Sequence, residues 1–231
     1  KNDFHHLLKI VQTGNGGCRN ISLGTIDRFF PLMNEFLEVE DKKGYYMTSM
    51  HKKAIKTAAD AATRAHRGQF RKDGKTPYIV HPERVAERVK FFGGDHIGII
   101  AAWLHDVMED CDNGDNIVCD TLRKIDLPLE ERDEIFVMVC ALTKNPAIKG
   151  KSERLADTLE RINQAPSQAI LIKLCDRMEN LVDARDQGQK FLSIYLRCAD
   201  QLIDALSDGA MKYGYIRALE TLKALRRTYP A

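Results

Sequence analysis

From His51 to the C-terminus, apolar residues recur every three or four positions, and no stretch alternates apolar and polar residues for more than a few positions. The first stripe consists of small residues, including Ala54, Ala58 and Ala62, and would let a second helix approach closely. A half-buried strand would instead need a period of two. The pattern predicts an all-α fold with helices at about 51–68, 82–92, 95–104, 131–142, 152–164, 167–185, 190–207 and 210–228.

The charged residues balance almost completely, since 35 basic and 33 acidic side chains leave a formal net charge of +2. So small a net charge does not provide the positive field that holds proteins on nucleic acids or anionic membranes, and we expect neither partner. No apolar run reaches the length of about 18 residues that predicts a membrane span. Six cysteines are scattered without a CxxC pair, which favours reduced thiols and a cytoplasmic location.

The first 48 residues differ in pattern from the rest. TGNGG at 13–17 is typical of a flexible connector, and Pro31 interrupts the near-helical apolar spacing of 25–39. We therefore expect an accessory helical extension over 1–48 and the main domain over 49–231. The extension is a candidate for oligomerisation, including a homo-oligomer, for regulation or for partner binding.

Individual residues indicate where several helices and turns begin or end. Asp95 is a suitable capping residue for the apolar helix that follows it. Pro82 suits the first turn of a helix, and the flanking prolines predict an extended segment from Pro77 to Val80. RKDGKT at 71–76 is typical of a turn.

Four polar side chains stand out against their apolar surroundings: His81, His105, Asp106 and Asp176. His105 and Asp106 end a strongly apolar helix. Asp176 lies inside AILIKLCDRMENL, where an unpaired buried carboxylate would be costly. Two imidazoles and two carboxylates form a donor set that suits a divalent first-row metal with open coordination positions, with Mn²⁺ favoured and Fe²⁺, Co²⁺ or Zn²⁺ left open.

Two further carboxylates follow closely. Glu109 lies four residues after His105, and Asp110 lies four residues after Asp106. This spacing places them one helical turn further along neighbouring faces. We expect them beside any ion bound by the preceding pair.

Candidate substrate contacts come from separate segments. Arg71 and Lys72 lie in the RKDGKT turn and supply local positive charge on an otherwise neutral protein, although an ordinary solvated turn remains open. Asn180 lies four residues after Asp176 and can share its cleft. Lys144 belongs to a basic loop, for which a phosphate contact and an ordinary solvated surface both remain open.

Four segments together resemble the successive motifs of the hydrolase domain of the RelA/SpoT homologue family. They are AHRGQFRKDGKTPYIVHP (65–82), AAWLHDVMEDC (101–111), ALTK (141–144) and LIKLCDRMENL (171–181). They occur in the family's order with compatible gaps, and the resemblance extends from about residue 50 to about residue 205. In length the chain is similar to the small alarmone hydrolases of this family, which resemble the metazoan SpoT-type enzymes.

The resemblance implies a helical bundle of the HD-domain type that removes the 3′-pyrophosphate from guanosine alarmones such as ppGpp. It implies metal ligation by His81, His105, Asp106 and Asp176. It further implies that Glu109 and Asp110 manage the attacking water, and that Arg71, Lys72 and Asn180 contact the nucleotide.

The sequence departs from the family pattern at Glu179, where His or an aromatic residue is common, and at Met178 and Cys175. Substrate preference therefore stays open. The alternatives are hydrolysis of the adenosine analogue ppApp, removal of the 2′-phosphate of NADPH, and an antitoxin-like regulatory module in which residues 1–48 bind a partner.

Overall fold

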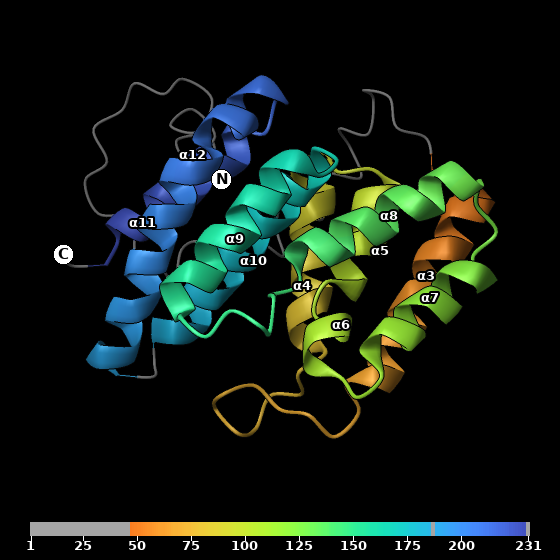
Figure 1. Cartoon of the computed structure of the whole chain (residues 1–231), viewed down its shortest axis with the longest axis horizontal. Helices are drawn as coiled ribbons and strands as arrows, with labels where there is room; N and C mark the ends of the chain where they lie inside the picture. Colours follow the sequence, from red (N-terminus) through yellow and green to blue (C-terminus); the bar gives the residue numbers. More distant parts are fainter. Residues whose placement is uncertain (1–46, 186–187, 230–231) are drawn as a thin grey trace, which may run out of the picture.

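A computed structural model describes residues 47–185 and 188–229, and these ranges fold into a bundle of helices (Figure 1). The helices are α3 (Ser49–Ala65), α4 (Val80–Phe91), α5 (His96–Leu104), α6 (Val107–Asp110), α7 (Gly114–Lys124), α8 (Leu129–Leu142), α9 (Lys151–Gln164), α10 (Gln168–Ala184), α11 (Gln189–Lys212) and α12 (Ile216–Arg227). The only β-type contact within the described ranges is an isolated bridge between Phe70 and Pro77. The all-α class is therefore confirmed.

The predicted extension cannot be compared with the structure, because residues 1–46 lie outside the described ranges. Helix α3 begins at Ser49, after Thr48 accepts a hydrogen bond from the backbone N–H of His51. The division of the chain at 48–49 remains a prediction.

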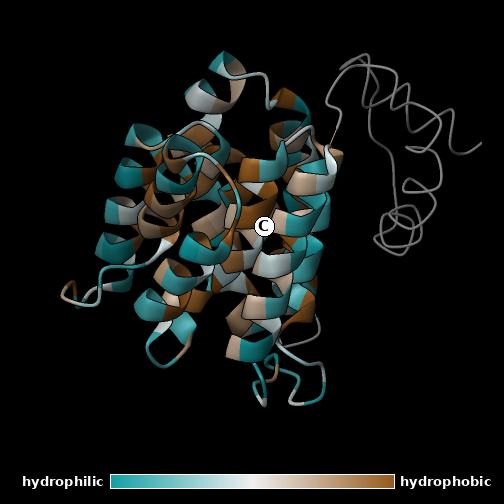
Figure 2. Cartoon of the chain, turned by 90° about the vertical axis from the view of Figure 1, so that its right-hand side faces the viewer, coloured by the Kyte–Doolittle hydropathy of each residue, from teal (hydrophilic) through white to brown (hydrophobic). Residues whose placement is uncertain are grey.

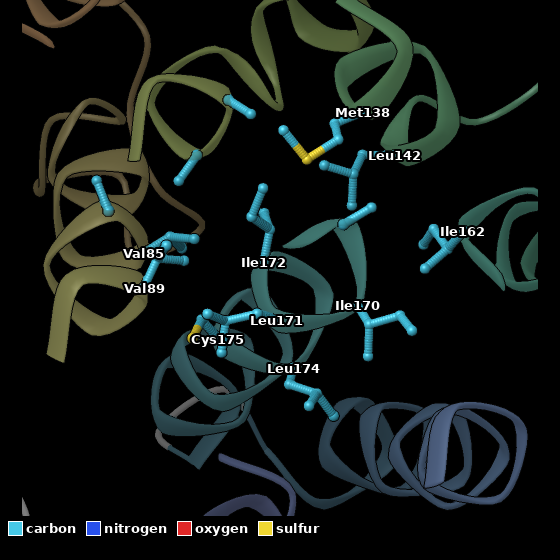
Figure 3. Close-up of a cluster of buried hydrophobic side chains, with 14 of the residues drawn as sticks. Val85, Val89, Met138, Leu142, Ile162, Ile170, Leu171, Ile172, Leu174 and Cys175 are labelled. Carbon is cyan, nitrogen blue, oxygen red and sulfur yellow. The ribbon is translucent and has the colours of Figure 1, made fainter. Parts of the chain in front are cut away.

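Helix α10 forms the centre of the bundle and packs against α4, α5, α8, α9, α11 and α12. Every residue from Gln168 to Glu179 is buried, as expected for a helix that is enclosed by others. Figure 3 shows its aliphatic side chains, including Ile170 and Ile172, meeting side chains of α4, α8 and α9. Burial of each such side chain contributes about 1.5–3 kcal/mol.

The outer helices have two faces, with polar residues toward solvent and apolar residues toward the core (Figure 2). Helix α5 is an exception, because nearly all of its residues are buried. Its N-terminus is capped by Asp95, as predicted. Oδ1 of Asp95 accepts hydrogen bonds from the N–H groups of Ile97 (2.8 Å) and Gly98 (3.2 Å). The same oxygen accepts a bond of 2.7 Å from Gln168 of α10.

The segment from Pro77 to Val80 was expected to be extended, and this prediction is wrong. The N–H of Val80 donates to Pro77 O (3.2 Å) and that of His81 donates to Tyr78 O (2.9 Å), so the chain turns and α4 begins at Val80. Pro82 is tolerated there because the first turn of a helix needs no N–H donor. The earlier start places His81 in the first helical turn.

Two further predictions need correction. No helix was predicted between 105 and 130, whereas α6 and α7 occupy most of that range. The break expected near 208–209 is also wrong, because α11 continues to Lys212 and the chain turns at Gly214, which has a φ of +82°. A Cβ at Gly209 would lie 2.5 Å from Cδ1 of Ile170, so this glycine allows α10 and α11 to approach closely.

Within the described ranges, no helix combines the length and the apolar character that crossing a membrane requires.

The Asp95 cap generates a stability prediction. We expect Asp95→Ala to lower the free energy of unfolding by about 1–2 kcal/mol, because the first N–H groups of α5 lose their acceptor. Asp95→Asn keeps an acceptor oxygen and serves as the control. Urea denaturation of the three proteins measures the effect, and an alanine variant as stable as the parent would contradict the capping role.

Candidate metal centre

His81 lies in the first turn of α4 with a side chain that is 2% exposed. Its Nε2 atom lies 3.2 Å from Oδ1 of Asp176 and 3.4 Å from Oδ2 of Asp106. These residues are far apart in the sequence. They meet because α4 packs against both α5 and α10 (Figure 1).

His105 lies immediately after α5, and its Nδ1 is 2.7 Å from the carbonyl oxygen of Ala102. A carbonyl oxygen only accepts, so Nδ1 carries a proton and donates it. The other ring nitrogen, Nε2, is buried without a hydrogen-bond partner and lies 3.2 Å from Oδ2 of Asp106. A histidine held by a backbone carbonyl on one side is suitably oriented to bind a metal on the other.

The surroundings favour a positive charge at His105. Burial alone lowers the pKa of its imidazole, but the carboxylates of Asp106 and Asp176 outweigh burial and raise this pKa to about 9. Burial likewise raises the pKa of Asp106, but His105 and His81 outweigh it and hold the pKa below its ordinary value. Either a proton or a metal cation at His105 Nε2 would offset the negative charges of Asp106 and Asp176.

Asp176 is anchored on α10 by neighbours on its own helix. Its Oδ2 accepts a hydrogen bond of 3.0 Å from the buried ammonium of Lys173, and its Oδ1 accepts one from the amide of Asn180. Burial raises the pKa of Asp176, but Lys173 and His81 outweigh it and hold the pKa well below the usual range. Asp176 is therefore a carboxylate with a fixed orientation.

We call His81, His105, Asp106 and Asp176 the His–Asp cluster. Donor atoms of its first three members lie within 4.8 Å of one another, and Asp176 adjoins them through His81. The structure thus brings together all four residues expected to bind metal. The nitrogen and oxygen donors and the partnerless Nε2 of His105 fit a divalent cation, while ligation itself remains a prediction.

Tyr78 joins the cluster to Asp110. Its hydroxyl lies 2.9 Å from Oδ2 of Asp106 and 2.6 Å from Oδ2 of Asp110. Burial, with the charges of both carboxylates, raises the pKa of Tyr78 far above its usual range, so the hydroxyl keeps its proton. Burial and the charge of Asp106 also raise the pKa of Asp110. Asp110 is exposed, yet it binds a proton more readily than an isolated aspartate because of these neighbours.

Tyr78 was not predicted to belong to the site, since an aromatic residue between two prolines carries no signal of its own. The buried His66 braces this loop. It stacks on Tyr78 with ring centroids 4.7 Å apart, and its Nδ1 lies 2.7 Å from Oε1 of Gln69. Gln69 in turn donates to the carbonyl oxygen of Asp110 (2.7 Å).

Glu109 and Lys144, for which separate roles were expected, form an ion pair with each other. The backbone N–H of Lys144 also donates to Oε2 of Glu109 (3.1 Å). Burial lowers the pKa of Lys144, but the Glu109 carboxylate outweighs it and raises the pKa. The contact fixes the loop after α8 beside α6.

Arg71 and Lys72 line a pocket next to the cluster, together with Asn180, Asp183, Ala184, Phe191 and Tyr195. The Lys72 ammonium lies 4.1 Å from the ring centroid of Phe191 and 2.6 Å from the hydroxyl of Tyr195. Both aromatic residues come from α11 and were absent from the predicted site. Because both residues lie outside the four sequence motifs, their position beside Lys72 was not predicted.

Glu179, noted above as a departure from the family pattern, is 2% exposed and pairs with Arg88 of α4. Arg84 lies further away, with 3.8 Å between its NH1 and Oε2 of Glu179. This buried carboxylate links α10 to α4, the two helices that carry Asp176 and His81. Its contacts are those of a residue that supports helix packing.

Comparison with known proteins agrees with this geometry. A protein-family model described as the HD domain matches residues 58–200. The chain belongs to this HD domain family. A solved structure described as a metazoan ortholog of SpoT that hydrolyzes ppGpp superimposes with a TM-score of 0.62, 23% identity and coverage of 80% of this chain and 98% of that chain. At this identity the match supports the fold.

Curated relatives refine the family. The guanosine-3′,5′-bis(diphosphate) 3′-pyrophosphohydrolase of Aquifex aeolicus is 33% identical over 189 residues, which cover 75% of this chain but 26% of that protein. A protein from Xenopus tropicalis with the same enzyme name, followed by the designation MESH1, is 34% identical to this chain. The match covers 57% of this chain and 69% of the Xenopus protein. The chain thus spans about a quarter of the Aquifex protein. These relatives confirm the resemblance to RelA/SpoT-type hydrolase domains.

Metal binding can be tested on the purified protein. We expect Asp106→Asn to weaken Mn²⁺ binding at least about 100-fold in calorimetric titrations, because a neutral amide replaces a carboxylate donor in the cluster. Glu131→Gln is a matched control, since Glu131 also pairs with a histidine, His96, at 2.8 Å but lies outside the cluster. Equal Mn²⁺ affinity in Asp106→Asn and the parent would contradict the assignment.

Proposed function

We propose that this chain is a metal-dependent 3′-pyrophosphohydrolase of guanosine alarmones, which converts ppGpp to GDP and pppGpp to GTP with release of pyrophosphate. The observation that carries the proposal is the buried His–Asp cluster with the carboxylates of Glu109 and Asp110 on the adjoining helix. The names of the relatives from Aquifex and Xenopus support the same reaction. A cytoplasmic location belongs to the proposal.

The cluster would hold a divalent cation, for which we propose Mn²⁺. Nitrogen and carboxylate donors in equal number suit a first-row ion better than a thiolate site would. When bound, such an ion supplies Lewis acidity, which makes water more acidic and offsets negative charge on a phosphate. The residues around the cluster supply the remaining functions.

Asp110 is the candidate for proton handling. A water molecule would attack phosphorus of the 3′-diphosphate, and the bond between that phosphorus and the ribose 3′-oxygen would break. The water loses a proton and the 3′-oxygen gains one, so a nearby group must accept and return it. The raised pKa of Asp110 suits this exchange, and the hydrogen bond from Tyr78 fixes its carboxylate.

Glu109 and Lys144 provide a second charged pair beside the cluster. The ion pair with Lys144 fixes the carboxylate of Glu109. A carboxylate in a fixed position suits a role in orienting the attacking water. Lys144 remains a candidate for contact with a substrate phosphate, for which it would have to exchange partners.

The cavity beside the cluster has a volume of about 10 Å³, so the nucleotide would lie against the residues around it rather than inside it. Lys72 supplies positive charge near Phe191 and Tyr195, a combination that suits a phosphate attached to an aromatic base. Arg71 and Asn180 line the same pocket.

The decisive assay is release of pyrophosphate from ppGpp by the Mn²⁺-loaded protein. We expect Asp110→Asn to lower kcat about 10²- to 10⁴-fold, because an amide cannot exchange the proton. Asp112→Asn, an exposed neighbour, should retain the parental kcat. Parallel rates on ppGpp, ppApp and NADPH identify the substrate. A parent protein that binds Mn²⁺ yet leaves ppGpp intact would overturn the proposal.

A further inference from the structure

The residues around the cavity beside the cluster include a carboxylate, Asp183, whose charge would oppose the binding of a polyanionic nucleotide there. Asp183 is near the end of α10 and its side chain is 28% exposed. Its Oδ2 atom lies 2.8 Å from Nε and 2.6 Å from NH2 of Arg71. Two nitrogens of one guanidinium thus contact a single carboxylate oxygen, in a charge-assisted contact that fixes the arginine.

Arg71 is in turn connected to the His–Asp cluster. Its NH2 donates to Oδ1 of Asn180 (3.1 Å), and the amide nitrogen of Asn180 donates to Oδ1 of Asp176. The amide of Asn180 is therefore used on both sides, with its oxygen toward Arg71 and its nitrogen toward the cluster. A continuous chain of hydrogen bonds runs from Asp183 to a candidate metal ligand.

The partners of Arg71 restrict what it can do. Its side chain is 14% exposed, and its guanidinium carbon lies 5.2 Å from the ring centroid of Tyr78. Burial lowers the pKa of Arg71, but Asp183 outweighs burial and raises it. Because Asp183 balances the charge of Arg71, the net positive charge at the pocket comes from Lys72.

Arg71 also begins the turn that carries Lys72. The N–H of Arg71 donates to Thr76 O (2.8 Å), and the N–H of Gly74 donates to Arg71 O (2.9 Å). If Arg71 lost its contact with α10, this turn would lose one of its attachments to the bundle, and the placement of Lys72 would become less restricted.

We propose that Asp183 is a positioning residue, which holds Arg71 against α10 and thereby fixes the 71–76 turn and Lys72 for nucleotide binding. Asp183 acts through Arg71 and does not contact the reacting phosphorus. The inference rests on the proposed function, because the nucleotide in question is ppGpp.

The kinetic test compares Asp183→Asn with the parent in the Mn²⁺-loaded full chain. We expect KM for ppGpp to rise about tenfold, while kcat and the Mn²⁺ Kd change less than about twofold, because binding is lost without damage to the cluster. In an Arg71→Met background, Asp183→Asn should have no further effect on KM. Asp183→Glu should restore part of the affinity, since it returns the negative charge.

A matched control is available where α11 contacts α12, outside the lining of the cavity. Asp200 of α11 also pairs with an arginine, since Arg226 donates from Nε (2.8 Å) and NH2 (3.0 Å) to its two oxygens. Asp200→Asn removes the same charge from the same kind of pair, away from the pocket. Its KM for ppGpp should equal that of the parent.

A second measurement requires no substrate. Hydrogen exchange at the Arg71 and Gly74 amides should become about tenfold faster in Asp183→Asn and stay unchanged in Asp200→Asn. An unchanged KM, or equal KM effects in the presence and absence of Arg71, would overturn the inference in an active parent. A parent protein that is inactive on ppGpp would contradict the proposed function. In that case, unchanged hydrogen exchange in Asp183→Asn would separately contradict the inference that Asp183 holds Arg71 against α10.

Discussion

Neither carboxylate of the His–Asp cluster, nor the charged imidazole of His105, could be buried alone, because an unpaired charge inside a protein costs several kcal/mol. Together they compensate one another, and the shifts in pKa of His105, Asp106 and Asp176 record this mutual dependence. Nε2 of His105 makes no hydrogen bond and lies 3.2 Å from Oδ2 of Asp106. We propose that a cation completes the arrangement there.

The bundle around α10 makes this arrangement possible. Helix α4 brings His81, the turn after α5 brings His105 and Asp106, and α10 brings Asp176, while the aliphatic core between these helices fixes their spacing (Figure 3). Lys173 and Asn180 hold Asp176 from within α10. Stability and chemistry therefore share one helix, since the residues that fill the core alternate along α10 with those that surround the cluster.

The sequence predicted features that depend on local pattern and failed where distant contacts decide. Apolar periodicity predicted most helices, and the motif order predicted which polar residues meet. A helix break near 208–209 was wrongly predicted, because only the approach of α10 reveals why a glycine is needed at position 209. Tyr78, Asp183 and Tyr195 were not predicted, because their roles arise from partners 28 to 123 residues away in the chain.

We propose that one divalent ion binds among the four residues of the His–Asp cluster. A crystal of the protein grown with Mn²⁺, with diffraction data collected at the manganese absorption edge, locates the ion directly. We expect an anomalous peak within bonding distance of donor atoms from His81, His105, Asp106 and Asp176. A peak elsewhere, or none at this cluster in a protein that binds Mn²⁺ in solution, would contradict it.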